Sequence, residues 1–291
     1  MYKIMPFVLA AVIALPALSS CRKVYDYIHA HPDAHDTLCR VTKLTIGNPG
    51  SKPVEFDVIY NNKGNPTDIL LPDPYIFFTT TEKHFRYDRF DRLSDYITNF
   101  RSFDPGPDGP IFRSAALSWQ KYAYPRPDII SDTVIEYVGV PIDGPPPIAP
   151  AGTAIYLYKF NTEGKMIATA QTVNLPHQPS PTFTPIAYDA RGNRDLSVYT
   201  DVVYDSSISV YRTNKVWQLV FNDYSRNNPV YVSIGFPFQL PTPTNQFGLP
   251  TQLPYISSGA VPNFGLGAST YLGSVYNIEY ACSAPRGPIN Y

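Results

Sequence analysis

A short pattern of turn-forming residues recurs along this chain of 291 residues and constrains its fold more than any other feature. In each copy an aromatic residue is followed by Asn or Asp, then two variable positions, then Gly or Asp. The four strong copies begin at Tyr60, Tyr87, Phe160 and Tyr188. Of two weaker copies, residues 224–228 have Asn in the glycine position, and residues 244–251 lack the aromatic.

The chemistry of this pattern predicts a β-hairpin tip at each copy. Asn or Asp at the start of a type I turn accepts a hydrogen bond from the backbone two residues on, and glycine is favoured at the fourth position. Gly, Asn and Asp also accept the positive φ needed where a hairpin closes through a bulge. We therefore expect a left-handed backbone at the tip residues Gly64, Asp91, Gly164, Gly192 and Gly248.

The residues before the first turn alternate as in a half-buried strand. Val54, Phe56 and Val58 share one face with Tyr60, and acidic residues occupy the other face. The same alternation leads into Phe160. The aromatic of each copy is therefore expected to be the last core-facing residue before its turn.

The composition supports a chain made of strands and turns. Charged residues make up 16% of the sequence, Pro and Gly contribute 31 and 17 residues, and Tyr occurs 23 times. Frequent aromatics and turn residues with few charges suit a β-rich exported protein. The formal net charge of -1 gives no electrostatic reason to expect nucleic acid as a partner.

Two of the strong copies resemble a known repeat. Tyr188-Asp189-x-x-Gly192 and Tyr87-Asp88-x-x-Asp91 are similar to the YD repeat of RHS-type proteins, and the whole arrangement resembles bacterial lipoproteins of unknown function that carry such hairpins. The resemblance implies an all-β fold, a curved antiparallel sheet of consecutive β-hairpins with long Pro/Gly-rich loops. It implies no activity.

Further segments can be assigned from residue type. Runs of β-branched and aromatic residues predict strands at 41–46, 132–140, 197–204, 216–222 and 230–236. Residues 92–100 and 114–122 are compatible with either a short helix or a strand. Proline density predicts loops without ladder pairing at residues 104–110, 143–147 and 176–185.

The N-terminus has the pattern of a lipoprotein leader. Lys3 is followed by an apolar run that is too short to span a membrane, and Leu18-Ser19-Ser20-Cys21 resembles the lipobox cut by bacterial lipoprotein signal peptidase. The resemblance implies a signal peptide at 1–20 and a lipidated tether at 21–37, acylated at Cys21. We expect residues 38–291 to form a single β-rich domain with hairpin repeats.

This leader also predicts the location of the protein. We expect it in the cell envelope of a Gram-negative bacterium, lipid-anchored at the outer membrane, with a lipid bilayer as a partner through the N-terminal acyl anchor. Whether it faces the periplasm or the cell surface stays open, with the periplasm favoured because Arg22-Lys23 is not an acidic run.

Two further cysteines, Cys39 and Cys282, lie near the two ends of the predicted domain. Disulfides persist in exported proteins, and closing so long a loop could contribute up to about 5 kcal/mol on the chain-entropy model. Sequence alone does not establish proximity, so a Cys39–Cys282 bond and two separate thiols both stay open.

Residues 227–278 contain no Asp, Glu, Lys or Arg. We expect long loops with short strands there, packed over one opening of the sheet, rather than disorder. An exposed apolar surface that binds a ligand is the alternative for this segment.

No catalytic or metal-binding pattern stands out. His29, His31 and His35 with Asp33 and Asp36 form a local cluster, which we interpret as part of the tether because it lies close to Cys21 and lacks a helical zinc frame. The chain has no Gly-x-Ser-x-Gly elbow. The glutamates are scattered singly, at Glu55, Glu82, Glu136, Glu163 and Glu279. We therefore expect no enzyme activity, no metal and no cofactor.

Three classes of function remain compatible with the sequence. The preferred one is a non-catalytic, membrane-anchored scaffold or binding protein whose partner is an unknown protein or glycan. A glycan-binding accessory lipoprotein would present an open row of aromatic side chains. A carrier of an apolar ligand would enclose a deep apolar groove.

Overall fold

The computed structural model describes residues 39–47, 53–71, 79–106, 109–138, 150–172, 181–195, 202–232, 242–254, 264 and 275–282. The strands of the large sheet are β1 (Cys39–Gly47), β2 (Val54–Tyr60), β3 (Pro66–Leu70), β4 (Thr79–Tyr87), β5 (Leu93–Gly106), β6 (Gly109–Arg126), β7 (Ile129–Val138), β8 (Gly152–Phe160), β9 (Met166–Thr172), β10 (Thr184–Pro185), β13 (Gln252–Pro254) and β14 (Val275–Cys282). A separate pair is formed by β11 (Val202–Tyr204) and β12 (Pro229–Val232). The helical segments are η3 (Val210–Thr213) and α2 (Lys215–Val220).

The large sheet has 12 strands in the order β10-β9-β8-β7-β6-β5-β4-β3-β2-β1-β14-β13. From β1 to β10 each strand pairs with the next along the chain, and the pairing is antiparallel. The chain then returns, so that β14 pairs with β1 and β13 with β14. The described part of the chain is thus one large antiparallel sheet with very little helix, which confirms the all-β expectation.

Alternation of residue type explains which face of the sheet is buried. In β2, Val54, Phe56 and Val58 are buried, whereas Glu55 faces outward and pairs with Lys43 of β1. Tyr60, Tyr87 and Phe160, the aromatics that precede three of the turns, pack against the same core as expected.

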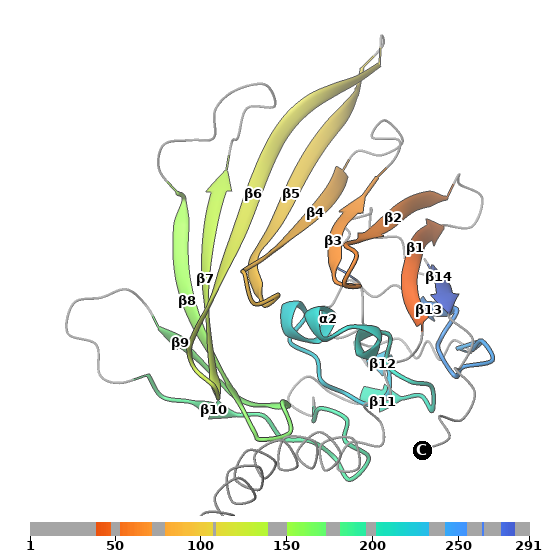
Figure 1. The fold of residues 1–291 in the computed structure, drawn as a ribbon. Coiled ribbons are helices and arrows are strands. Elements are labelled where there is room, and N and C mark those ends of the chain that lie inside the picture. Colours follow the sequence, from red (N-terminus) through yellow and green to blue (C-terminus); the bar gives the residue numbers. More distant parts are fainter. Residues whose placement is uncertain are drawn as a thin grey trace, which may run out of the picture.

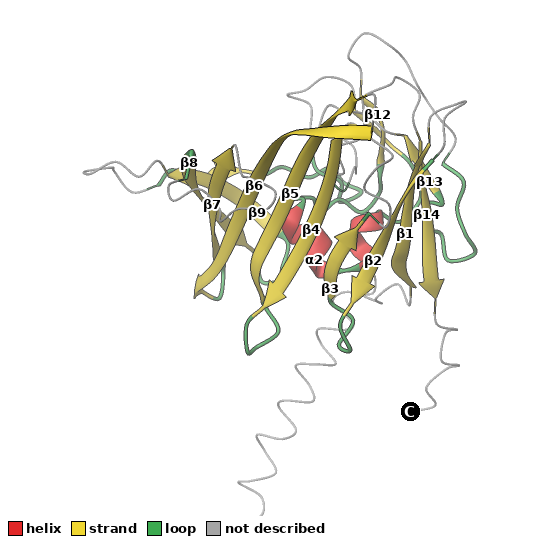
Figure 2. Cartoon of the chain, turned by 90° about the horizontal axis from the view of Figure 1, so that it is seen from above, coloured by secondary structure: helices red, strands yellow, loops and turns green. Residues whose placement is uncertain are grey.

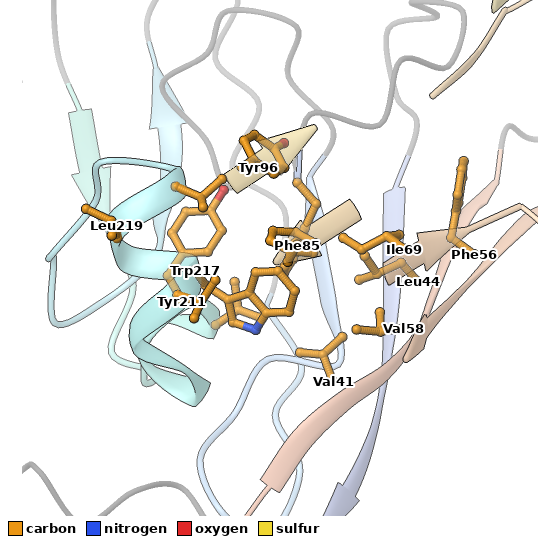
Figure 3. Packing of buried hydrophobic residues seen from close by; sticks show 14 of the residues in the cluster. Val41, Leu44, Phe56, Val58, Ile69, Phe85, Tyr96, Tyr211, Trp217 and Leu219 are labelled. Atoms are coloured by element: carbon orange, nitrogen blue, oxygen red, sulfur yellow. The ribbon is translucent and has the colours of Figure 1, made fainter. Parts of the chain in front are cut away.

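The helical segment η3–α2 completes this core. The Trp217 side chain is fully buried, and its ring meets Phe85 of β4 edge-on with ring centroids 5.4 Å apart. Phe264 packs edge-on against Trp217 and Tyr211. Figure 3 shows Trp217 and Tyr211 of the helical segment beside Phe85 of β4, and Figure 1 shows strands of the large sheet on both sides of α2.

Residues 216–222, expected to form a strand, instead contain helix α2 (Lys215–Val220). The Asn214 side chain caps the helix by accepting a hydrogen bond from the Val216 N–H at 2.9 Å. The buried residues recur at helical spacing, at positions 216, 217, 219 and 220. The strand prediction was wrong because the apolar residues fit either periodicity and the cap decides between them.

The expected loop at residues 104–110 is also wrong where the structure describes it, because residues 104–106 belong to β5 and residues 109–110 to β6. Pro105 lies directly opposite Pro110 in this pair of strands. Residues 92–100 and 114–122, left open between helix and strand, belong to β5 and β6. In the expected loop at 176–185, Thr184–Pro185 forms the short edge strand β10, where proline is tolerated.

The weak copy at residues 224–228 does not form a hairpin tip, which corrects that expectation. It lies between α2 and β12, and Asn228 is absent from the described residues with positive φ. Ser225 stands in the Asn/Asp position, and its N–H donates instead to the Asp223 carboxylate. The leader with Cys21, the tether, the loop at 143–147 and most of residues 227–278 lie outside the described residues.

Replacing Gly164 tests the turn geometry without interference from neighbours. Gly164 has a φ of +76°, and a Cβ placed there would meet nothing within 4 Å. We expect Gly164→Val to lose about 1 to 3 kcal/mol of unfolding free energy, because a β-branched residue is strained at positive φ, and Gly164→Asn to lose clearly less. Thermal and urea melts of both variants measure this. Equal losses would contradict a turn that depends on the left-handed backbone.

Candidate functional site: the turn edge of the sheet

Five turns with one geometry lie along the same edge of the large sheet. We call this the turn edge and define it by residues 61–65, 88–92, 161–165, 189–193 and 245–249. The antiparallel order places β2–β3, β4–β5 and β8–β9 connections on one side, together with the β6–β7 turn at Arg126 to Ile129. Figure 2 shows several of these turns at the lower border of the sheet.

Each turn is held by the side chain of its Asn or Asp. In the first turn, Asn61 Oδ1 accepts hydrogen bonds from the N–H groups of Lys63 and Asn65, both at 3.0 Å. Asp88, Asn161, Asp189 and Asn245 each accept the same two hydrogen bonds, from the backbone N–H groups two and four residues further along the chain. One side-chain oxygen thus satisfies two backbone donors that the tight turn removes from the ladder.

The left-handed residue follows from this arrangement. The φ values are +85° at Gly64, +76° at Gly164, +87° at Gly192, +75° at Gly248 and +60° at Asp91. In every turn the N–H of this residue donates to the carbonyl of the Asn or Asp three residues earlier. The positive φ expected at these five positions is therefore present.

The two acidic turn residues with resolved shifts have lowered pKa values. Desolvation by burial would raise the pKa of Asp88, but hydrogen bonds from the backbone and side chain of Arg92 outweigh it. Desolvation is likewise outweighed at Asp189, whose pKa is lowered by the N–H groups of Asn193 and Arg191. Both carboxylates are therefore ionised at neutral pH while they hold their turns.

A tyrosine further along the chain donates a hydrogen bond to each turn. The residue six positions after the start of each copy lies opposite the first residue and offers its carbonyl outward. That carbonyl accepts a hydrogen bond from a tyrosine hydroxyl in all five turns. The pairs are Tyr87 to Pro66, Tyr124 to Leu93, Tyr188 to Met166, Tyr204 to Arg194 and Tyr280 to Pro250.

These tyrosine hydroxyls keep their protons at neutral pH and so remain hydrogen-bond donors. Burial raises the pKa of both Tyr124 and Tyr204 to about 12, and it raises that of Tyr87, Tyr188 and Tyr280 further. Phe160 has no hydroxyl, and its strand β8 follows the β6–β7 turn, which is not a copy of the pattern. Among the aromatics of the pattern, the hydroxyls of Tyr87 and Tyr188 join the preceding turn, whereas the Tyr60 hydroxyl has no hydrogen-bond partner among the described residues.

Removing one of these hydroxyls should destabilise the fold. Tyr188 donates to the Met166 carbonyl at 2.7 Å, and Tyr188→Phe leaves that partly buried acceptor without its donor. We expect a loss of about 1 to 3 kcal/mol of unfolding free energy. Urea unfolding measures it, with Tyr156→Phe as control, because no hydroxyl hydrogen bond is found for Tyr156 among the described residues. A loss no larger than the control's would contradict this role of the hydroxyl.

The outward surface of the turn edge carries cations and one aromatic ring. Lys63 pairs with Asp91 of the next turn, and Arg92 pairs with Asp88 within its own turn. Phe90 is 62% exposed, and the guanidinium groups of Arg89 and Arg92 lie 4.7 and 5.1 Å from its ring centroid. Lys165 instead turns inward, over the Tyr188 ring and onto the Gly192 carbonyl.

The first and last strands are joined at the same edge. Cys39 of β1 lies opposite Cys282 of β14, and the two form a disulfide across a sequence separation of 243. The side chain of Arg40, the next residue, lies against Gly64 of the first turn. Of the two arrangements left open by the sequence, the structure has the disulfide.

A buried carboxyl group on the inner face was not singled out by the sequence. Asp132 of β7 is 1% exposed, and its Oδ2 accepts a hydrogen bond from the Tyr158 hydroxyl at 3.0 Å. Its Oδ1 has no hydrogen-bond partner among the described residues, and the same holds for Oδ1 of Asn222, which follows α2 with a φ of +51°. The sequence signal for this buried group was an aspartate that shares the core-facing side of a strand with Ile130 and Val134.

Desolvation dominates at Asp132 and raises its pKa to about 7, although the Tyr158 hydrogen bond acts in the opposite direction. Between about pH 4 and pH 7 the folded protein therefore keeps a proton that the unfolded chain releases. Stability contributed by this neutral carboxyl is thus lost as the pH rises through that window.

Asp132→Asn should remove this pH dependence. We expect the variant to be more stable than the parent by about 2 to 4 kcal/mol at pH 8 and by only about 1 kcal/mol at pH 5, because an amide keeps the neutral form at every pH. Urea unfolding at the two pH values measures the difference, with the exposed Asp128→Asn as control. A variant less stable than the parent at both pH values would contradict a neutralising environment.

The described residues offer no arrangement that binds a metal: no group of three or more His, Cys, Asp or Glu side chains converges there. In that same part of the chain, no helix is both long and apolar enough to cross a membrane. The His29–Asp36 cluster and Cys21 lie outside the described residues. Of the residues singled out from the sequence, the structure places the turn residues and the Cys39–Cys282 disulfide along one edge of the sheet. The five tyrosine hydroxyls and Asp132 are functional candidates that the sequence analysis did not single out.

Comparison with known proteins adds no assignment to this geometry. No protein-family model matches the chain, and no curated protein matches it.

Proposed function

We propose that the protein is an exported lipoprotein of the Gram-negative cell envelope, anchored through acylated Cys21, and that its β domain is a non-catalytic scaffold or binding module. The observation that carries the proposal is the lipobox-like Leu18-Ser19-Ser20-Cys21 at the end of a short apolar leader. The Cys39–Cys282 disulfide supports it, because such bonds persist in oxidising compartments outside the cytoplasm.

The way the core is filled favours a scaffold over a carrier. Trp217, Phe264 and Val210 of the segments that face the sheet are at most 1% exposed, and their contacts fill the space beside β4 with side chains. A carrier would need this space for its ligand. The inner face thus acts as a structural core in this proposal.

The described surface also gives limited support to glycan binding. Only Ile59, Phe90 and Val203 stand out there as exposed large apolar residues, and they come from different elements. A platform for sugars would present several aromatic rings in a row. We therefore keep glycan binding as the alternative. At Trp119, Asp95 accepts the indole N–H at 2.8 Å, and the Lys121 ammonium lies 4.6 Å from the ring centroid.

We further propose that the sheet is built from YD/RHS-like hairpins and curves around η3–α2. Five turns with the same two side-chain hydrogen bonds and the same tyrosine link support a repeated unit. The position of α2 between strands of the two halves of the sheet supports curvature (Figure 1). This unit is a structural module, and the proposal attaches no activity to it.

Replacing Cys21 by Ala tests the anchor in cells. We expect the parent protein to be acylated, cleaved and fractionated with membranes, and to accumulate as a precursor under globomycin, which inhibits lipoprotein signal peptidase. Cys21→Ala should take up no fatty acid and remain an uncleaved precursor with or without globomycin, because that peptidase requires an acylated cysteine, whereas Cys39→Ala should be processed like the parent. Immunoblots of membrane and soluble fractions measure the outcome. Unchanged processing and fractionation of Cys21→Ala would contradict the proposal.

A further inference from the structure

We infer that the turn edge is a peripheral membrane surface that contacts an anionic phospholipid bilayer directly. Phe90 would enter the headgroup region, and the cations beside it would meet lipid phosphates. The inference deepens the proposed function, on which its cellular orientation rests, but the contact itself does not need the acyl chain.

The point where the tether enters the domain supports this orientation. Strand β1 starts at Cys39 on the turn edge, as its neighbour Arg40 shows by lying against Gly64. Only 17 residues separate Cys21 from Cys39, a span of at most about 60 Å even when fully extended. An anchor at Cys21 therefore leads to the turn edge before any other part of the sheet.

In the ion pairs at this edge the cation is the more exposed partner, whereas at the third turn Glu163 is exposed and Lys165 turns inward. Three of these ion pairs lie in the turn edge, and the fourth lies in the β6–β7 turn on the same side of the sheet. The pairs are Lys63–Asp91, Arg92–Asp88, Arg126–Asp128 and Arg191–Asp189. The exposed fractions of the side chains are 58% against 42% in the first pair and 61% against 38% in the last. Asp88 and Asp189 in addition direct an oxygen toward the backbone N–H groups of their own turns.

Phe90 adds the apolar part of a membrane contact. It lies at the tip of its turn and is the most exposed large apolar residue described. Two arginines flank its ring at 4.7 and 5.1 Å. An exposed aromatic ring between long cationic side chains matches the chemistry of the bilayer interface, where rings sit at headgroup level and arginines reach the phosphates. A soluble anion would satisfy the arginines but not the ring.

Vesicle binding by the unacylated protein tests the contact. The probe is the mature chain, residues 21–291 with Cys21→Ala, mixed with vesicles of phosphatidylglycerol and phosphatidylethanolamine or of phosphatidylcholine alone. We expect cosedimentation with the anionic vesicles at low salt, release at high salt, and little binding to phosphatidylcholine. Arg89→Ser with Arg126→Ser should lower the partition coefficient about 25-fold, at about fivefold for each cation.

A matched variant controls for net charge. Lys43→Ser with Lys121→Ser removes two cations from the middle of strands β1 and β6, away from the turn edge. We expect this variant to lose less than half an order of magnitude of binding. An equal loss in the two double variants, or no binding of the unsubstituted chain to anionic vesicles, would overturn the inference.

A second readout locates the aromatic ring. Phe90→Trp should gain fluorescence quenching by lipids brominated in the acyl chain, beyond the quenching of Trp119 and Trp217 in the unsubstituted chain. No added quenching would refute insertion of residue 90. Since acylation is absent from these assays, a negative result leaves the Cys21 anchor untouched, and a failed anchor in cells leaves a positive vesicle result standing.

Discussion

One side-chain oxygen that accepts two backbone N–H groups is the interaction on which the rest of this structure depends. At Asn61, Asp88, Asn161, Asp189 and Asn245 it fixes the same tight turn, and the turn fixes where the next strand begins. The bulged register beside these turns then places a carbonyl outward, where a tyrosine of the neighbouring strand reaches it. The Asn or Asp thereby determines the turn, and the tyrosine ties the turn to a later segment of the chain.

Much of this could be predicted from the sequence because the turn is a local structure. The tip positions with positive φ follow from the identity of Gly64, Gly164 and Gly192 alone. The tyrosine links were missed because they join residues at no fixed separation: Tyr87 reaches back to Pro66, whereas Tyr204 reaches only to Arg194. Such pairs depend on the length of the intervening strands, which no local pattern encodes.

Other differences between expectation and structure share a physical origin in ambiguous residues. Val216, Trp217 and Leu219 satisfy a strand or a helix equally, and the Asn214 cap decides for the helix. Proline excludes a residue from donating to a ladder but not from sitting opposite another proline, as Pro105 and Pro110 do. Asp132 is expensive to bury as an ion, so the fold holds it near its neutral form beside Tyr158. The surroundings, not the residue itself, set these three outcomes.

The insertion of the last strand beside the first has a consequence for biogenesis. Strand β1 finds one neighbour, β2, almost at once, but its other neighbour is β14, at the opposite end of the sequence. Because the chain is made from its N-terminus, β1 keeps an open hydrogen-bonding edge until β14 has been synthesised. The domain therefore matures only once its last strand is complete, and a chain that stalls before residue 275 would expose a template for intermolecular pairing.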